Sequence, residues 1–350
     1  RTNERTNERT NERTNERTNE RTNERTNERD VLFDNVRAVG VFAVPLLHTI
    51  SVAGEGGEKV HQLLGIFAVP VLLFISGFFS KGIEKARRNA VRSLLCPYLI
   101  CQSAYVLVGA LCLKLGLIAS TPVSASILAP SGPFYYLLVL FTLRYFVADL
   151  SRLRHPLVIC VIIGLAGGID DQLGFTGALH ATFALAPFFL EGYYIREEFI
   201  HALRKIPVAI PILLLISVTA VCYAYPVSGY YMNYYSFYGI SIRAGIASRL
   251  AFYCMGTVCI LGLFRILPKR KCFLTMIGRN SMPVYIISTF LAPQLYYVIA
   301  PYLPFSEVNL VAAIYVTGFC LVLVLVSSRE CFTRLYKRFF QKVERIIFTE

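Results

Sequence analysis

One stretch decides the fold of this chain: Phe33-Asp34-Asn35-Val36-Arg37-Ala38-Val39-Gly40-Val41-Phe42-Ala43-Val44-Pro45-Leu46-Leu47-His48. It opens an apolar segment that is long enough to cross a membrane as a helix. Ionisable side chains at membrane depth are costly, so Arg37 and His48 are candidate functional residues. A helix rises about 1.5 Å per residue, which places the two residues about 16 Å apart along its axis. If both act, they hold opposite ends of one extended ligand.

The composition extends this conclusion to the whole chain. Hydrophobic residues make up 55% of the 350 residues and charged residues only 16%. A soluble domain of this length could hardly stay in solution with that imbalance, so we expect an all-α polytopic membrane protein. The ten cysteines form no CxxC pair and lie mostly in apolar runs, where cysteine acts as a small hydrophobe. We therefore expect neither a disulfide framework nor a metal site.

The N-terminus is a low-complexity repeat. Residues 1–28 are seven copies of Arg-Thr-Asn-Glu, each electrically neutral, so the net charge of +13 belongs entirely to the rest of the chain. The repeat contains nothing apolar to bury, and a helix would place like charges at i,i+4. We predict a disordered tail over residues 1–29, the alternative being an arm that touches lipid or a partner. No signal peptide is expected, because no small-residue cleavage site follows the apolar run.

The rest of the chain divides into a transmembrane domain over residues 30–328 and a basic cytoplasmic C-terminal tail over 329–350. A bilayer core requires about 20 apolar residues per helix. On this basis we predict ten transmembrane helices, at about Val31–Val52, Val60–Ser80, Leu94–Ile118, Phe134–Leu150, Leu157–Ile169, Gly174–Ile195, Ile206–Tyr225, Ile242–Leu267, Leu274–Leu303 and Val308–Ser327.

Charge in the loops predicts the orientation. The loops after the second, fourth, sixth and eighth spans are rich in Lys and Arg, and the others are acidic or uncharged. Since Lys and Arg accumulate on the cytoplasmic side, both termini should be cytoplasmic. The short fifth span is needed for this alternation, because without it the basic residues 269–271 would lie outside.

This orientation places a dense basic cluster, Lys85, Arg87, Arg88 and Arg92, on the cytoplasmic side after the second span. Arginine forks and lysine ammonium groups suit a ligand that carries several phosphates. The alternative is that the cluster only enforces topology. Arg37 could instead extend to the lipid headgroups or pair with Asp34, and His48 could be a structural polar group between helices.

Further ionisable residues lie within the predicted spans and should face the bundle interior. Arg144 and His180 are candidates for binding substrate. Glu191 and Arg249 could pair with arginine or glutamate partners inside the bundle, which would explain such residues equally well. Ser76 and Gly77 would permit close packing of the second helix.

Four motifs in this order resemble the acyltransferase type 3 family of bacterial integral membrane proteins, especially its fucose 4-O-acetylase-like branch. The first is a basic residue, ten residues and a histidine, matched by Arg37 and His48. The segment Pro70-Val71-Leu72-Leu73-Phe74-Ile75-Ser76-Gly77-Phe78 is similar to the family's motif in the second span. The third motif is a basic stretch followed by Leu94-Leu95-Cys96-Pro97-Tyr98. The fourth motif is Ile277-Gly278-Arg279-Asn280-Ser281-Met282-Pro283-Val284-Tyr285.

Two positions differ from the family's pattern. Some members have an Arg-x-x-Arg pair before the proline, whereas the spacing here is Arg88-x-x-x-Arg92. Members often have a histidine three residues after the late tyrosine, where this chain has Ser288.

The resemblance implies an enzyme of the cytoplasmic (inner) membrane that moves an acyl group, with acetyl expected, from cytoplasmic acyl-CoA to a hydroxyl of a cell-surface or lipid-linked carbohydrate. Acetyl-CoA would be a co-substrate rather than a bound cofactor. Arg37 and the basic cluster would hold the donor, and His48 would act as general base, because its pKa is ordinarily near neutral. A transient acyl-histidine is an alternative. The expected partners are lipid, carbohydrate and acyl-CoA, with no nucleic acid.

A rival hypothesis is a transporter or flippase for a lipid-linked saccharide, which would also need buried charges. Transporters often contain inverted repeats, and the two halves of this sequence show no self-similarity. A sensor or scaffold has no specific feature in its favour.

Overall fold

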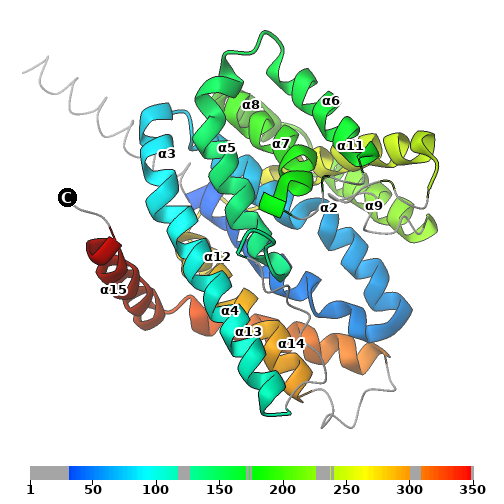
Figure 1. Ribbon diagram of the computed structural model, residues 1–350. Coiled ribbons are helices and arrows are strands. Elements are labelled where there is room, and N and C mark those ends of the chain that lie inside the picture. Colours follow the sequence, from blue (N-terminus) through cyan, green and yellow to red (C-terminus); the bar gives the residue numbers. More distant parts are fainter. Residues whose placement is uncertain are drawn as a thin grey trace, which may run out of the picture.

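The computed structural model describes residues 31–116, 127–170, 173, 176–225, 237, 240–299 and 309–347. Within these ranges every regular element is a helix and no strand occurs, so the predicted all-α class is confirmed (Figure 1). The predicted disordered tail, residues 1–29, lies outside the described residues.

The chain enters the bundle through a helix over residues 31–47, which we call the first helix. The remaining elements follow in this order: η1 Ile50–Ala53, α2 Gly54–Phe78, α3 Ile83–Ala90, the π turn η2 Val91–Leu95, α4 Cys96–Lys114, η3 Gly132–Phe134, α5 Tyr135–Ser151, α6 Pro156–Ile169, η4 Thr176–Ala178, α7 Leu179–Tyr194, α8 Glu197–Leu203, α9 Ala209–Ala224, α11 Ile242–Ile266, α12 Phe273–Arg279, α13 Ser281–Ile299, α14 Asn309–Ser327 and α15 Glu330–Ile347.

Each predicted span overlaps a helix of the structure. Four stretches of the described chain are long and apolar enough to cross a membrane: Ile50–Phe78, Ile83–Lys114, Ile242–Ile266 and Leu310–Ser327. Shorter apolar helices cover Pro156–Ile169, Ala209–Ala224 and Ser281–Ala292. The structure therefore supports the assignment as a membrane protein. The number of ten membrane crossings and the cytoplasmic location of both termini stay predictions.

The first helix and α2 form the centre of the bundle. Phe33 in the first helix is buried, and its ring centroid lies 4.4 Å from that of Phe78 and 4.8 Å from that of Phe264. The second half of α2, from Ile66 onward, is largely buried as well. Residues on these two helices are consequently held in place by packing on several sides.

Glycines allow α2 and α7 to cross closely. A Cβ at Gly77 would overlap the carbonyl oxygen of Phe189, and a Cβ at Gly192 would overlap that of Phe74. Small residues permit such backbone approach between apolar helices. The predicted packing role of Gly77 is thus confirmed, and the crossing fixes the neighbouring Ser76 beside the cavity described next.

Candidate active site

A cavity of about 240 Å³ lies among the first helix, α2, α5 and α13. Its lining residues are Arg37, Val41, Leu72, Ser76, Phe79, Tyr136, Leu140, Arg144, Ser281, Met282 and Tyr285. We call it the arginine cavity. It brings together two of the residues that the sequence singled out, Arg37 and Arg144, from helices that are distant in the chain.

Arg37 is held from two sides. Its Nη1 donates to Oδ1 of Asp34 at 3.1 Å and lies 3.5 Å from the carbonyl oxygen of Gly278, and its guanidinium lies 5.6 Å from the ring centre of Phe79. The pairing with Asp34 that the sequence offered as an alternative is therefore present. It does not remove Arg37 from the cavity, because the residue is part of the cavity lining.

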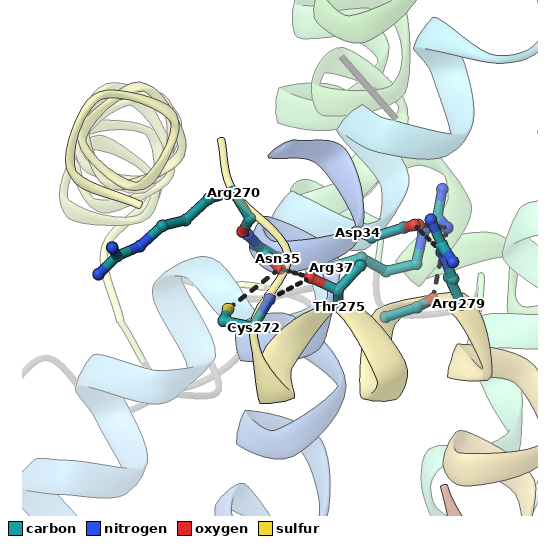
Figure 2. A network of polar contacts seen from close by, with 8 residues as sticks. Asp34, Asn35, Arg37, Arg270, Cys272, Thr275 and Arg279 are labelled. Carbon is teal, nitrogen blue, oxygen red and sulfur yellow. Dashed lines mark hydrogen bonds and ion pairs between the residues drawn. The ribbon is translucent and has the colours of Figure 1, made fainter. Parts of the chain in front are cut away.

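A polar network joins this end of the first helix to α12 and the loop before it (Figure 2). Oδ2 of Asp34 accepts from Nε of Arg279 at 3.2 Å. The buried amide of Asn35 donates to the carbonyl oxygens of Pro268 and Arg270 at 2.7 and 3.2 Å, and its Oδ1 accepts from the Thr275 hydroxyl at 2.7 Å. The first helix is thereby fixed against a segment more than 230 residues away in the sequence.

The close approach of α12 explains part of the late motif. A Cβ at Gly278 would overlap the carbonyl oxygen of Asp34, so only glycine lets the two backbones meet here. Later in the motif, Tyr285 reaches the cavity and its ring centroid lies 5.2 Å from that of Tyr136. The motif therefore both anchors the first helix and supplies one wall of the cavity.

Arg144 is the second cation of the cavity. Its Nη2 lies 3.4 Å from the Ser76 hydroxyl, and its buried Nε has no hydrogen-bond partner among the described residues. Tyr136 interacts with the same serine. The described lining residues include two arginines and no Asp or Glu, and the one carboxylate in contact with Arg37 belongs to Asp34, outside the lining. Such a site favours an anion or a polarised carbonyl oxygen.

The other interior charges have different surroundings. Glu191 accepts from the Thr257 hydroxyl with both carboxylate oxygens, at 2.9 and 3.0 Å. Arg249 is buried and donates to the carbonyl oxygen of Gly164 at 3.2 Å. Neither residue lines the arginine cavity.

The basic cluster Lys85, Arg87, Arg88 and Arg92 is exposed on α3 and the following turn. Arg87 lies 4.7 Å from the ring centre of Tyr145, the residue next to Arg144 in α5. The cluster is therefore adjacent to the helix that supplies the second cavity arginine. Arg92 lies in the π turn η2, where the Arg88 to Arg92 spacing departs from the family's pattern. Such turns occur frequently at functional sites.

His48 lies at the opposite end of the first helix, just after the last helical residue. It is half-buried and does not line the arginine cavity. The hydroxyl of the adjacent Thr49 lies 3.4 Å from Sγ of Cys320, which belongs to α14. The structure thus places Arg37 within the first helix and His48 just after its end, in separate surroundings.

A second histidine lies beside His48, and sequence reasoning missed it. Nδ1 of His61 in α2 is 2.7 Å from the carbonyl oxygen of Leu47, which is the carbonyl of the peptide bond leading into His48. A carbonyl oxygen only accepts hydrogen bonds, so Nδ1 of His61 carries a proton and donates it in this bond. No short motif signals this pair, because the turn between the two helices brings it together.

The remaining predicted residues lie elsewhere. Nε2 of His180 lies 2.9 Å from the carbonyl oxygen of Asp170, which connects the end of α6 to the start of α7. His180 does not line the arginine cavity. Ser288, at the position where relatives often have histidine, is fully buried, and its hydroxyl lies 3.4 Å from the carbonyl oxygen of Tyr285.

The fold and this site define a helical membrane protein with a cationic cavity and a histidine pair at opposite ends of one central helix. A family model described as an acyltransferase domain, the type 3 family, matches residues 31–328. The chain therefore belongs to this acyltransferase family. No curated protein and no solved structure gave a match. Membership makes the chain a membrane acyltransferase, and the fucose 4-O-acetylase-like branch stays a prediction.

Proposed function

We propose that this acyltransferase moves an acyl group, with acetyl expected, from acyl-CoA to a hydroxyl of a cell-surface or lipid-linked carbohydrate in the cytoplasmic membrane of a bacterium. The observation that carries the proposal is the arginine cavity, where Arg37 and Arg144 face one space whose known lining lacks a carboxylate. A phosphate-bearing donor fits that charge, and the basic cluster on α3 extends it.

The size of the cavity limits what it holds. Its volume of about 240 Å³ is below the roughly 300–1,000 Å³ of pockets that enclose drug-sized ligands. It accommodates one portion of the donor, such as a phosphate, while the thioester end would extend toward His48. The remaining phosphates would bind along α3, at Lys85, Arg87, Arg88 and Arg92.

The histidine pair supplies the proton transfer. In the proposed reaction His48 takes the proton of the acceptor hydroxyl while its oxygen attacks the thioester carbonyl carbon. The C–S bond then breaks, and the CoA sulfur leaves with the proton that His48 had accepted. His61, through its bond to the Leu47 carbonyl oxygen, holds the turn that carries His48. Acyl transfer through His48 itself is the alternative course of the same reaction.

Transfer of label tests the proposal directly. Purified protein in lipid vesicles would receive acetyl-CoA labelled in the acetyl group together with candidate glycans, and label on the glycan would be measured. We expect labelled glycan with the parental protein and none with His48→Gln at equal abundance. Movement of a lipid-linked saccharide across the vesicle membrane without label transfer would support the transporter alternative instead.

A further inference from the structure

The last described helix, α15, has two chemically distinct faces. At about 100° per residue, its eight large apolar side chains fall within an arc of roughly 140°. They are Phe332, Leu335, Tyr336, Phe339, Phe340, Val343, Ile346 and Ile347. Its basic residues Arg334, Lys337, Arg338, Lys342 and Arg345 all lie outside this arc. In Figure 1 the helix extends from the end of α14 at the lower left edge of the molecule.

Only one side of the apolar face is packed against the protein. Tyr336 and Phe340 contact the main hydrophobic core, with ring centroids 4.5 Å apart, and burial raises the pKa of the Tyr336 hydroxyl above its ordinary value. Leu335, Phe339 and Ile346, on the other side, are 65%, 50% and 75% exposed. The bundle therefore orients the helix but leaves an apolar edge uncovered.

The charge next to this edge is positive. Arg338 and Lys342 neighbour the exposed apolar residues around the helix axis, and both are exposed. The helix has five basic residues and only two acidic ones, Glu330 and Glu344. An apolar strip bordered by Lys and Arg is typical of helices that lie in the interface of an anionic bilayer.

The connection to α14 places this helix beside the membrane. Leu310–Ser327 is apolar enough to span a bilayer, and near its end Leu321, Val322 and Val326 are 41%, 59% and 44% exposed, a surface that requires lipid. α14 ends at Ser327 and α15 begins at Glu330, so α15 starts at the edge of the same lipid.

We propose that α15 binds along the surface of an anionic phospholipid membrane, with Leu335, Phe339 and Ile346 among the acyl chains. Arg338 and Lys342 then lie at the headgroups, where each basic residue strengthens binding by about fivefold. This inference is independent of the acyl acceptor and donor.

The absence of tryptophan from the whole sequence makes a clean test available. Phe339→Trp places a single fluorophore on the exposed apolar edge, and Gln341→Trp places one on the exposed polar face as the matched control. Each full-length variant would be reconstituted in nanodiscs of phosphatidylcholine, with or without phosphatidylglycerol, using lipids brominated on the acyl chains. Elution at the parental volume shows that the variant is folded.

We expect bromine to quench Phe339→Trp in the bilayers with phosphatidylglycerol and not to quench Gln341→Trp. Adding Arg338→Gln and Lys342→Gln, or raising the salt concentration, should abolish the quenching. Lack of quenching of Phe339→Trp would overturn the proposal and point to a protein partner on this edge. Equal quenching without phosphatidylglycerol would refute the preference for anionic lipid, and equal quenching of the control would refute the proposed orientation.

Discussion

The two ends of the first helix differ in how firmly they are attached to the rest of the molecule. At the arginine end, Asp34, Asn35 and Arg37 together reach Pro268, Arg270, Thr275, Gly278 and Arg279 (Figure 2). At the histidine end the regular helix stops at residue 47, and a turn carries His48 into η1. The described hydrogen bonds there involve neighbouring turns, Cys320 and His61.

The proposed reaction would give the two ends two kinds of task. A donor with fixed charges is best held by cations whose positions are set in advance, because organised charges need no rearrangement on binding. A proton acceptor must be approached by the acceptor substrate and must change protonation state. The half-buried His48, outside the rigid polar network, suits that second task.

The largest expected effect lies at the histidine end. His48→Ala should lower acetyl transfer by about 10²- to 10⁴-fold, since that is what a general base typically contributes. His48→Gln keeps hydrogen bonding but cannot take a proton near neutral pH, so it should lose the same activity. Single-turnover transfer from labelled acetyl-CoA measures both. Parental rates in the glutamine variant would make His48 a structural polar group, and His61 and then His180 would be tested as the base.

The next effect concerns the arginine end. Arg37→Ala or Arg144→Ala should each lower kcat/KM for acyl-CoA by about 10- to 150-fold, because a hydrogen bond to a charged group contributes about 1.5–3 kcal/mol. Arg37→Lys keeps the positive charge but not the bidentate hydrogen-bonding geometry of the guanidinium, so kcat/KM should fall less than in Arg37→Ala. Steady-state kinetics with varied acyl-CoA would show the change. An unaltered kcat/KM in a folded Arg37→Ala protein would refute donor binding in the cavity.

The anchoring of the first helix can be broken without changing any charge. Gly278→Ala adds a methyl group where the Asp34 carbonyl oxygen lies, and overpacking of this kind typically costs about 1–3 kcal/mol. We expect a lower melting temperature in detergent or nanodiscs. Gly82→Ala is the matched control, because no atom beyond the two adjacent residues lies within 4 Å of its added Cβ, so the stability of this variant should be unchanged. Equal melting temperatures for both variants would contradict the close contact.

The smallest effect is expected on α3. Arg88→Glu with Arg92→Glu removes exposed charges, which are screened by salt, so acyl-CoA use should weaken moderately and most clearly at low ionic strength. Because these residues also bear on orientation, accessibility of the N-terminus must be measured in the same membranes. If the double variant has the parental orientation in the membrane and uses acyl-CoA as well as the parental protein does, the basic cluster serves only as a topology signal.

The linear order of residues was sufficient for the helical class and for the family, but it predicted one span over Leu274–Leu303 where the helix is interrupted at Asn280. Hydrophobic runs depend on neighbours within one helix, so they are visible in the chain. The pairing of Arg37 with Asp34 was predictable for the same reason, since the two residues lie one turn apart.

Contacts between distant segments were decided by tertiary structure alone. Tyr136 lines the arginine cavity because α5 packs beside α2. His61 contacts the end of the first helix because the chain reverses direction between this helix and α2. Glu191 was expected to be a candidate for pairing with arginine, yet Thr257 is its observed partner. Which buried polar groups meet depends on helix rotation and crossing, and these follow from the fit of side chains across the whole bundle rather than from any single segment.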